Sequence, residues 1–178
     1  MDTMIIRESN ESDYNTIMMV NKAAFNSDVE PKLVSDLISD PSAKPVLSLV
    51  AVKDGEIVGH ILFTKCSLEP STDISIYILA PVSVLPSHQG AGIGGALITR
   101  GLEMLAARGV DLVFVLGDPG YYPRFGFESA VSYGFDAAYP IAEEHLDAWM
   151  VHILNPRLVG EVKGKVICAN MLNKPEYW

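Results

Sequence analysis

A glycine-rich turn followed by a helical pattern is the stretch of this sequence best suited to chemistry. Four glycines fall within the six residues from 90 to 95, and four residues separate them from an apolar run that ends near Leu85. Apolar residues then recur at three- and four-residue steps, as expected for a helix: Ile93, Leu97, Ile98, Leu102 and Leu105. The first turn of a helix has unpaired N–H groups and partial positive charge, and glycine lets a phosphate approach the backbone. The stretch therefore predicts a phosphate-binding site.

Two other phosphate-binding motifs compete for this stretch. A P-loop is excluded, because no Lys-Ser or Lys-Thr follows the glycines. The dinucleotide fingerprint G-x-G-x-x-G is satisfied from Gly90 to Gly95, and Asp118 lies just beyond the next apolar run. However, hairpins are expected before the glycines, four residues from Pro86 to Gln89 separate them from the strand, and too little chain follows for a doubly wound sheet. An NAD-dependent oxidoreductase is therefore the weaker alternative.

Two motifs in sequence order carry a resemblance to a known family. Gln89-x-x-Gly92-x-Gly94, which follows Val82-Ser83-Val84, resembles the acetyl-CoA signature of the GNAT superfamily of N-acetyltransferases. The block from Tyr121 to Phe127, YYPRFGF, is similar to the F-Y-x-x-x-G-F segment of that family, one strand further on. The longer run from 115 to 127 resembles the YhbS-like branch in particular.

The resemblance implies a fold and an activity. The fold is three-layered and mixed α/β, with a mostly antiparallel central sheet that splays between its fourth and fifth strands and carries helices on both faces. Residues 1–178 form one domain. The activity is direct transfer of an acetyl group from acetyl-CoA to a primary amine of a small molecule or a protein N-terminus. A non-catalytic acyl-CoA-binding or regulatory module on the same fold remains an alternative, as does a longer acyl group.

The resemblance also assigns roles to residues of the two motifs. Tyr122 is the expected general acid, with its hydroxyl reaching the CoA sulfur. The backbones of Val82 and Val84 are expected to contact pantetheine, and the N–H group of Val84 to stabilise the oxyanion. The cofactor-binding residues are expected to be Val82, Ser83, Val84, Gln89, Gly90, Ala91, Gly92, Ile93, Gly94 and Gly95, with the N–H groups from Gln89 onward taking the pyrophosphate.

Other contacts remain open from the sequence. Glu69, Asp73 and His60 are candidates for the general base, and none has a supporting motif. Three acidic residues of the first two helices are candidate contacts for the amine, although solvated surface charge explains them as well: Asp28, Glu30 and Asp36. Many family members have a basic residue between the motif glutamine and the first motif glycine, where this chain has Gly90 and Ala91. Arg100 or Arg124 is expected to compensate.

Composition limits the classes of partner. The chain has 178 residues, 49% hydrophobic and 20% charged, which is typical of one globular domain. A net charge of −9 argues against nonspecific nucleic-acid binding and suits a cationic amine. No apolar run is long enough for a membrane helix, and the N-terminus shows no signal peptide, so a cytoplasmic protein is expected. Cys66 and Cys168 lack metal-ligand spacing and are expected to be buried thiols. No metal is expected, and a homodimer remains open.

The remaining pattern predicts an order of elements. Asn10 to Asp13 and Asp28 offer caps for two helices, and Asp54-Gly55 predicts a hairpin turn. Pro81 predicts a bulge or break in its strand. A turn is expected from 69 to 72, a short helix or turn from 119 to 125, and a helical turn from 142 to 146. The expected strands are 3–7, 46–53, 56–67, 73–85, 112–116, 149–154 and 165–169.

Overall fold

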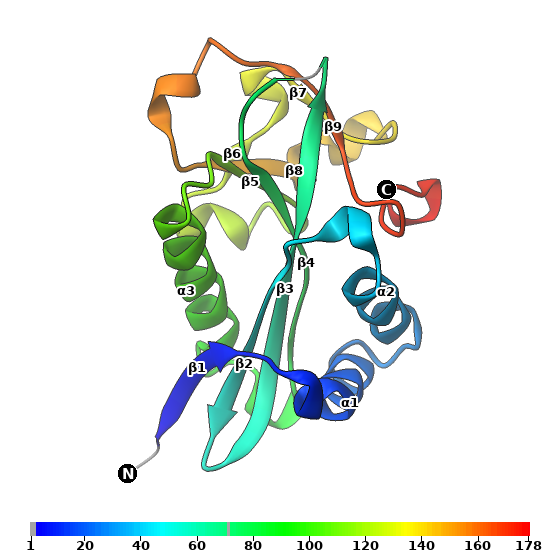
Figure 1. The fold of residues 1–178 in the computed structure, drawn as a ribbon, viewed down its shortest axis with the longest axis vertical. Helices are drawn as coiled ribbons and strands as arrows, with labels where there is room; N and C mark the ends of the chain where they lie inside the picture. The colour runs from blue at the N-terminus through cyan, green and yellow to red at the C-terminus, as the bar shows by residue number, and fades with distance from the viewer. Residues whose placement is uncertain (1–2, 71) are drawn as a thin grey trace.

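A mixed sheet with helices on both faces forms the fold (Figure 1). The structure is a computed structural model that describes residues 3–70 and 72–178. The expected turn from 69 to 72 contains Ser71, and the N-terminus considered above begins with Met1 and Asp2. These three residues lie outside the described part of the chain.

The strand order in the main sheet is β1-β2-β3-β4-β5-β8-β6. Every neighbouring pair on this path is antiparallel except β4 and β5, which run parallel. The far end of β3 also pairs with β9, and β9 pairs with β7. The strands are β1 (Met4–Glu8), β2 (Leu47–Lys53), β3 (Glu56–Glu69), β4 (Ile76–Val84), β5 (Leu112–Leu116), β6 (Glu128–Ser129), β7 (Phe135–Asp136), β8 (Trp149–Ile153) and β9 (Gly164–Ile167).

The sheet splays between β4 and β5, as predicted. The two strands pair only where Ile76–Ile78 face Leu112–Phe114, although β4 continues to Val84. The predicted bulge lies at the point of divergence. Ile61 pairs with Val82 and Phe63 with Leu79, so β4 has one residue more than β3 in this interval, which contains Ala80 and Pro81. Because proline has no N–H group, it cannot donate to a ladder at this position.

Three helices cover the two faces of the sheet. In Figure 1, α1 (Tyr14–Phe25) and α2 (Val29–Ile38) lie on one side and α3 (Ile93–Ala107) on the other. The periodic apolar residues of α3 are all buried, as the sequence pattern predicts. Before α1, the Asn10 side chain accepts a hydrogen bond from the Ser12 N–H group, and the Asp13 carboxylate accepts one from the Asn10 N–H group. This capping box confirms the predicted start of the first helical segment.

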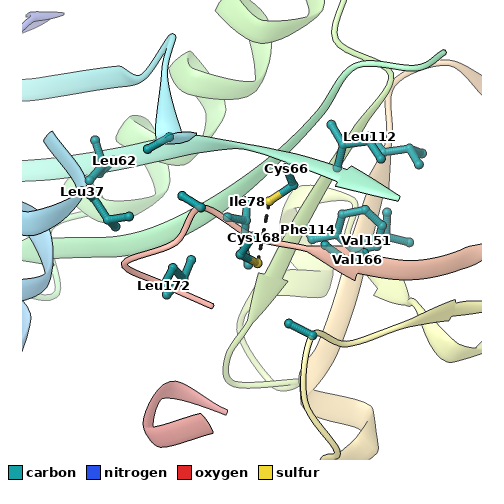
Figure 2. Packing of buried hydrophobic residues seen from close by; sticks show 14 of the residues in the cluster. Leu37, Leu62, Cys66, Ile78, Leu112, Phe114, Val151, Val166, Cys168 and Leu172 are labelled. Carbon is teal, nitrogen blue, oxygen red and sulfur yellow. Dashed lines mark hydrogen bonds between the residues drawn. The ribbon is translucent and has the colours of Figure 1, made fainter. Parts of the chain in front are cut away.

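The core has one cluster on each face. The cluster under α3 includes Phe63, Leu97 and Val113. The other cluster joins α1 and α2 to the C-terminal segment and includes Leu37, Phe114 and Leu172 (Figure 2). Within it the Cys66 thiol donates to Cys168 Sγ at 3.8 Å, and burial raises the pKa of Cys66. The predicted buried thiols are confirmed.

The sequence prediction was least complete in the C-terminal half and at strand ends. Asp54 and Gly55 form the predicted hairpin turn, both with positive φ. The expected strand from 73 starts only at Ile76, and the expected helical turn at 142–146 is a 3-10 helix from Glu143 to Ala148. The sequence showed no sign of β6 or β7, because two-residue strands have no measurable periodicity. Among residues 3–70 and 72–178, no helix is long and apolar enough to cross a bilayer.

Candidate active site

A cleft of about 830 Å³ opens where α3 begins. Its walls are the end of β4, the glycine turn, the outer face of α3 and the 3-10 helix η4 (Tyr122–Phe125) with the residue before it. The residues lining it are Val84, His88, Gln89, Gly90, Gly92, Ile93, Gly94, Gly95, Ala96, Thr99, Arg100, Glu103, Tyr121, Arg124 and Phe125. The cleft thus joins both sequence motifs, which are about thirty residues apart in the chain.

The four glycines of the turn have two different structural roles. Gly90 and Gly92 have φ angles of +79° and +81°, and a Cβ atom at either position would meet nothing within 4 Å. These two glycines shape the turn and leave its cleft side open. A Cβ atom on Gly94 would lie 3.1 Å from the Tyr121 hydroxyl oxygen, and one on Gly95 would lie 3.0 Å from the Phe125 ring. Gly94 and Gly95 therefore let the aromatic residues of the second motif pack directly onto α3.

Backbone donors at the start of α3 are available to a ligand. The N–H group of Ala96 is the first in the helix to bond within it, to the Gly92 carbonyl at 3.0 Å. Within the described part of the chain, the N–H groups from 90 to 95 have no hydrogen-bond partner, and the first turn of α3 contains no acidic residue. Gln89 differs, because its N–H group donates to Pro86 and its side-chain Nε2 donates to the Val84 carbonyl at 3.0 Å. The predicted glutamine therefore braces the turn.

The free edge of β4 faces the splay. The N–H group of Leu85 donates to the Val58 carbonyl at 2.9 Å, so Leu85 directs its backbone toward β3. Backbone direction alternates along an antiparallel strand, so Val82 and Val84 direct their N–H and C=O groups the other way. Ser83, between them, is buried, and its hydroxyl lies 3.5 Å from the His60 carbonyl.

Tyr122 is packed at the end of β5, on the other side of the splay. The residue is 9% exposed, and its ring stands edge-on to Tyr121 and Phe127 at centroid distances of 5.2 and 5.7 Å. A Cβ atom on Gly117 would come within 2.4 Å of this ring, so glycine is needed directly after β5. Burial raises the pKa of Tyr122 to about 12, which keeps the hydroxyl protonated at neutral pH. Tyr121 packs against Tyr122 and also lines the cleft.

The charged side chains of the cleft are Arg100, Glu103 and Arg124, with His88 at the turn. Arg100 donates to Glu103 at 3.5 Å, and both side chains are more than half exposed. Arg124 has no carboxylate partner among the described residues. Its guanidinium carbon lies 4.9 Å from the Tyr121 ring centroid, and its Nη2 donates to the Gly120 carbonyl at 3.4 Å. Both arginines considered in the sequence analysis thus face the cleft.

None of the three candidate bases lines the cleft. His60 is fully buried, with Nδ1 3.2 Å from Asn21 Nδ2 and Nε2 3.0 Å from Ser48 Oγ. Burial lowers the pKa of His60 to about 3, so it is a poor proton acceptor at neutral pH. Glu69 is the last residue of β3 and lies opposite Lys165 in the register between β3 and β9. Asp73 precedes β4. Both therefore lie near the start of β4, whereas the cleft adjoins its end at Val84.

The three acidic candidates for amine binding differ in their partners. Asp28 forms an ion pair with Lys22 at 3.2 Å, and Asp36 forms one with Lys32 at 2.6 Å. Glu30, in the first turn of α2, has a buried Oε2 atom with no hydrogen-bond partner among the described residues. Glu30 is therefore the one of the three whose carboxylate is not already engaged by a cation.

Sequence reasoning missed Thr99, Glu103 and Phe125 as cleft residues. The signal for the first two was helical spacing: positions 96, 99, 100 and 103 form one face of α3 that continues from the glycine turn. Phe125 could be placed only through its packing on Gly95. No group of three or more metal-binding side chains occurs within the described ranges.

Comparison with known proteins identifies relatives that share this architecture. The family model of the acetyltransferase (GNAT) domain matches residues 5–130. An uncharacterized N-acetyltransferase of Escherichia coli K12, YjhQ, is 43% identical over 164 residues, which cover 91% of this chain and 90% of that protein. The crystal structure of E. coli YhbS in complex with CoA has a TM-score of 0.87 at 31% identity and covers 97% of this chain and 93% of its own. A GNAT family acetyltransferase from Brucella melitensis, in complex with acetyl-CoA, has a TM-score of 0.77 at 32% identity, with coverages of 96% and 98%.

Proposed function

Since this chain belongs to the GNAT acetyltransferase family, we propose that it transfers an acetyl group from acetyl-CoA directly to a primary amine of a small molecule or a protein N-terminus. The observation that carries the proposal is the open edge of β4 beyond Ile78, which leads to the unpaired N–H groups at the start of α3. An extended thioester arm and a pyrophosphate fit these two features in this order. The solved relatives with CoA or acetyl-CoA bound support this choice of donor.

The cofactor is proposed to bind mainly through the backbone. Its pyrophosphate accepts hydrogen bonds from N–H groups between Gly90 and Gly95, where the partial positive charge of α3 favours an anion. Its pantetheine arm lies along Val82 and Val84 as an added strand would. The bulge at Pro81 and the brace from Gln89 to the Val84 carbonyl hold this edge in place.

The reaction requires a bond to form between the amine nitrogen and the thioester carbon. The oxyanion that develops is stabilised by the N–H group of Val84, and the C–S bond breaks to release CoA. Tyr122 is proposed to donate its hydroxyl proton to the departing sulfur. Its raised pKa keeps that proton in place until the sulfur carries negative charge. The acceptor ammonium must lose a proton before it attacks, and we propose that water accepts it, because none of the three candidate bases lines the cleft. The second proton, which the nitrogen carries after the attack, restores the hydroxyl of Tyr122.

The acceptor is proposed to be cationic before it reacts. The net charge of −9 attracts an ammonium group over long range. Within α2, the unpaired carboxylate oxygen of Glu30 is the acidic group best able to hold one.

Thermal unfolding with added ligands tests the proposal. A ligand at 100 times its dissociation constant stabilises a protein by about 2.7 kcal/mol, which is readily measured as a rise in melting temperature. Acetyl-CoA and CoA should both raise it, whereas NAD and NADP should not. Thiol release from acetyl-CoA should then be measured across a panel of amines. A shift with NAD alone would refute the assignment, and CoA binding without turnover of any amine would favour the non-catalytic alternative.

A further inference from the structure

We propose that Arg124 binds a phosphate group at the nucleotide end of CoA, in place of the basic residue missing from the glycine turn. This inference rests on the proposed function of the cleft. Arg124 is then the main cationic side chain of the site, and it lies in the second motif, outside the phosphate-binding turn.

The glycine turn has too little charge of its own. Between Gln89 and Gly92 the chain has only Gly90 and Ala91, so this part of the turn offers backbone N–H groups and no cation. CoA carries a pyrophosphate and a 3′-phosphate monoester. A protein with net charge −9 needs a local cation to hold such an anion against the overall field.

Arg124 is the cleft arginine whose charge is least compensated. Arg100 is already paired with Glu103 on the same helix. No carboxylate neutralises Arg124 within the described ranges, and its one hydrogen bond is a long contact of 3.4 Å to a carbonyl. The other donors of its guanidinium therefore remain available, in the fork geometry that matches phosphate oxygens.

The surrounding aromatic residues place Arg124 opposite α3. The guanidinium lies over the Tyr121 ring, and the Tyr121 hydroxyl approaches Gly94 at the first turn of the helix. The neighbouring Phe125 ring packs on Gly95. These contacts fix the cation on the wall facing the unpaired N–H groups, so an anion between them would be held from both sides.

Titration calorimetry with CoA and 3′-dephospho-CoA tests the inference. Arg124→Gln should weaken CoA binding by about tenfold or more, as expected for loss of a charged hydrogen bond. Arg100→Gln should weaken it less, because Glu103 already offsets that charge. Arg157→Gln changes the net charge equally on an exposed segment outside the cleft and should leave the affinity within twofold. Melting temperatures without ligand show whether the variants remain folded.

The two ligands identify the phosphate. If the effect of Arg124→Gln falls below twofold with 3′-dephospho-CoA, Arg124 contacts the 3′-phosphate; if it stays equal, Arg124 contacts the pyrophosphate. Either result supports the inference. CoA binding by Arg124→Gln within twofold of wild type, or a larger loss in Arg100→Gln, would overturn it and leave the proposed function intact. Failure of the wild-type protein to bind CoA would instead refute the proposed function and, with it, this inference.

Discussion

The two faces of the sheet differ in how their polar groups are hydrogen-bonded. On the α3 face, the backbone donors from 90 to 95 are unpaired and open to a cleft. On the α1–α2 face, a row of polar side chains runs from Ser9 through Ser48 to His60, and its members are hydrogen-bonded to one another. Ser9 Oγ lies 2.7 Å from Ser48 Oγ, and Ser48 Oγ also bonds His60 Nε2. Substitutions at the turn should therefore change binding and turnover, whereas those in the bonded row from Ser9 to His60 should change stability.

Removing the Tyr122 hydroxyl should have the largest effect. Tyr122→Phe keeps the ring between Tyr121 and Phe127 and should lower kcat about 100-fold, the range expected for a general acid. Steady-state thiol release measures kcat, and calorimetry should give an unchanged Kd for CoA. Tyr133→Phe removes a hydroxyl that bonds Glu128 outside the cleft and serves as the control. A kcat for Tyr122→Phe within threefold of wild type would exclude the acid role.

Alanine at Gly92 should weaken cofactor binding, whereas alanine at Gly55 should cause only the same loss of stability. Gly92 and Gly55 have φ angles of +81° and +82°, and a Cβ atom on either would meet nothing within 4 Å. Replacement by alanine should therefore cost each about 1 kcal/mol of stability. Only Gly92→Ala places its methyl where a phosphate must approach, so it should weaken acetyl-CoA binding by about 10- to 30-fold. Equal affinities for the two variants would contradict the placement of the pyrophosphate.

The burial of His60 on the α1–α2 face should make the free energy of unfolding depend on pH. Its pKa is about 3 when folded, against an ordinary value near 6.5, so the unfolded chain binds the proton more tightly. The contribution of neutral His60 to the free energy of unfolding is therefore fully present well above pH 6.5. It falls by up to about 1.4 kcal/mol per pH unit as the pH drops below that value. Denaturant unfolding between pH 5 and 7 should show this slope in wild type and a smaller one in His60→Gln, because burial also lowers the pKa of His152. His145→Gln, at an exposed site, should keep the slope.

Loss of the cap before α1 should have the smallest effect on stability and no effect on cofactor binding. Asn10→Ala removes the acceptor for the Ser12 N–H group and should lower the unfolding free energy by about 1 kcal/mol. The Kd for acetyl-CoA should not change, because Asn10 lies outside the cleft. A change in affinity larger than the twofold scatter of calorimetry would show that the two faces are coupled.

Local features of the sequence predicted much of this fold. The Asp54-Gly55 turn, the bulge at Pro81 and the start of α3 each depend on the backbone preferences of a few adjacent residues. The general base could not be chosen in the same way. Glu69, Asp73 and His60 are equally plausible by residue type, and only their places in the sheet removed them from the cleft.

The sequence by itself determined the glycine turn, the helix behind it and the strand before it, because φ preferences and apolar periodicity act over a few residues. Only the tertiary structure decided which side chains meet at that turn. Tyr121 and Phe125 reach α3 because Gly94 and Gly95 have no Cβ atoms, and Arg124 lies over the Tyr121 ring. Contacts between segments so far apart in the chain depend on how the intervening strand folds back, and this is set by long-range burial, which leaves no local pattern in the sequence.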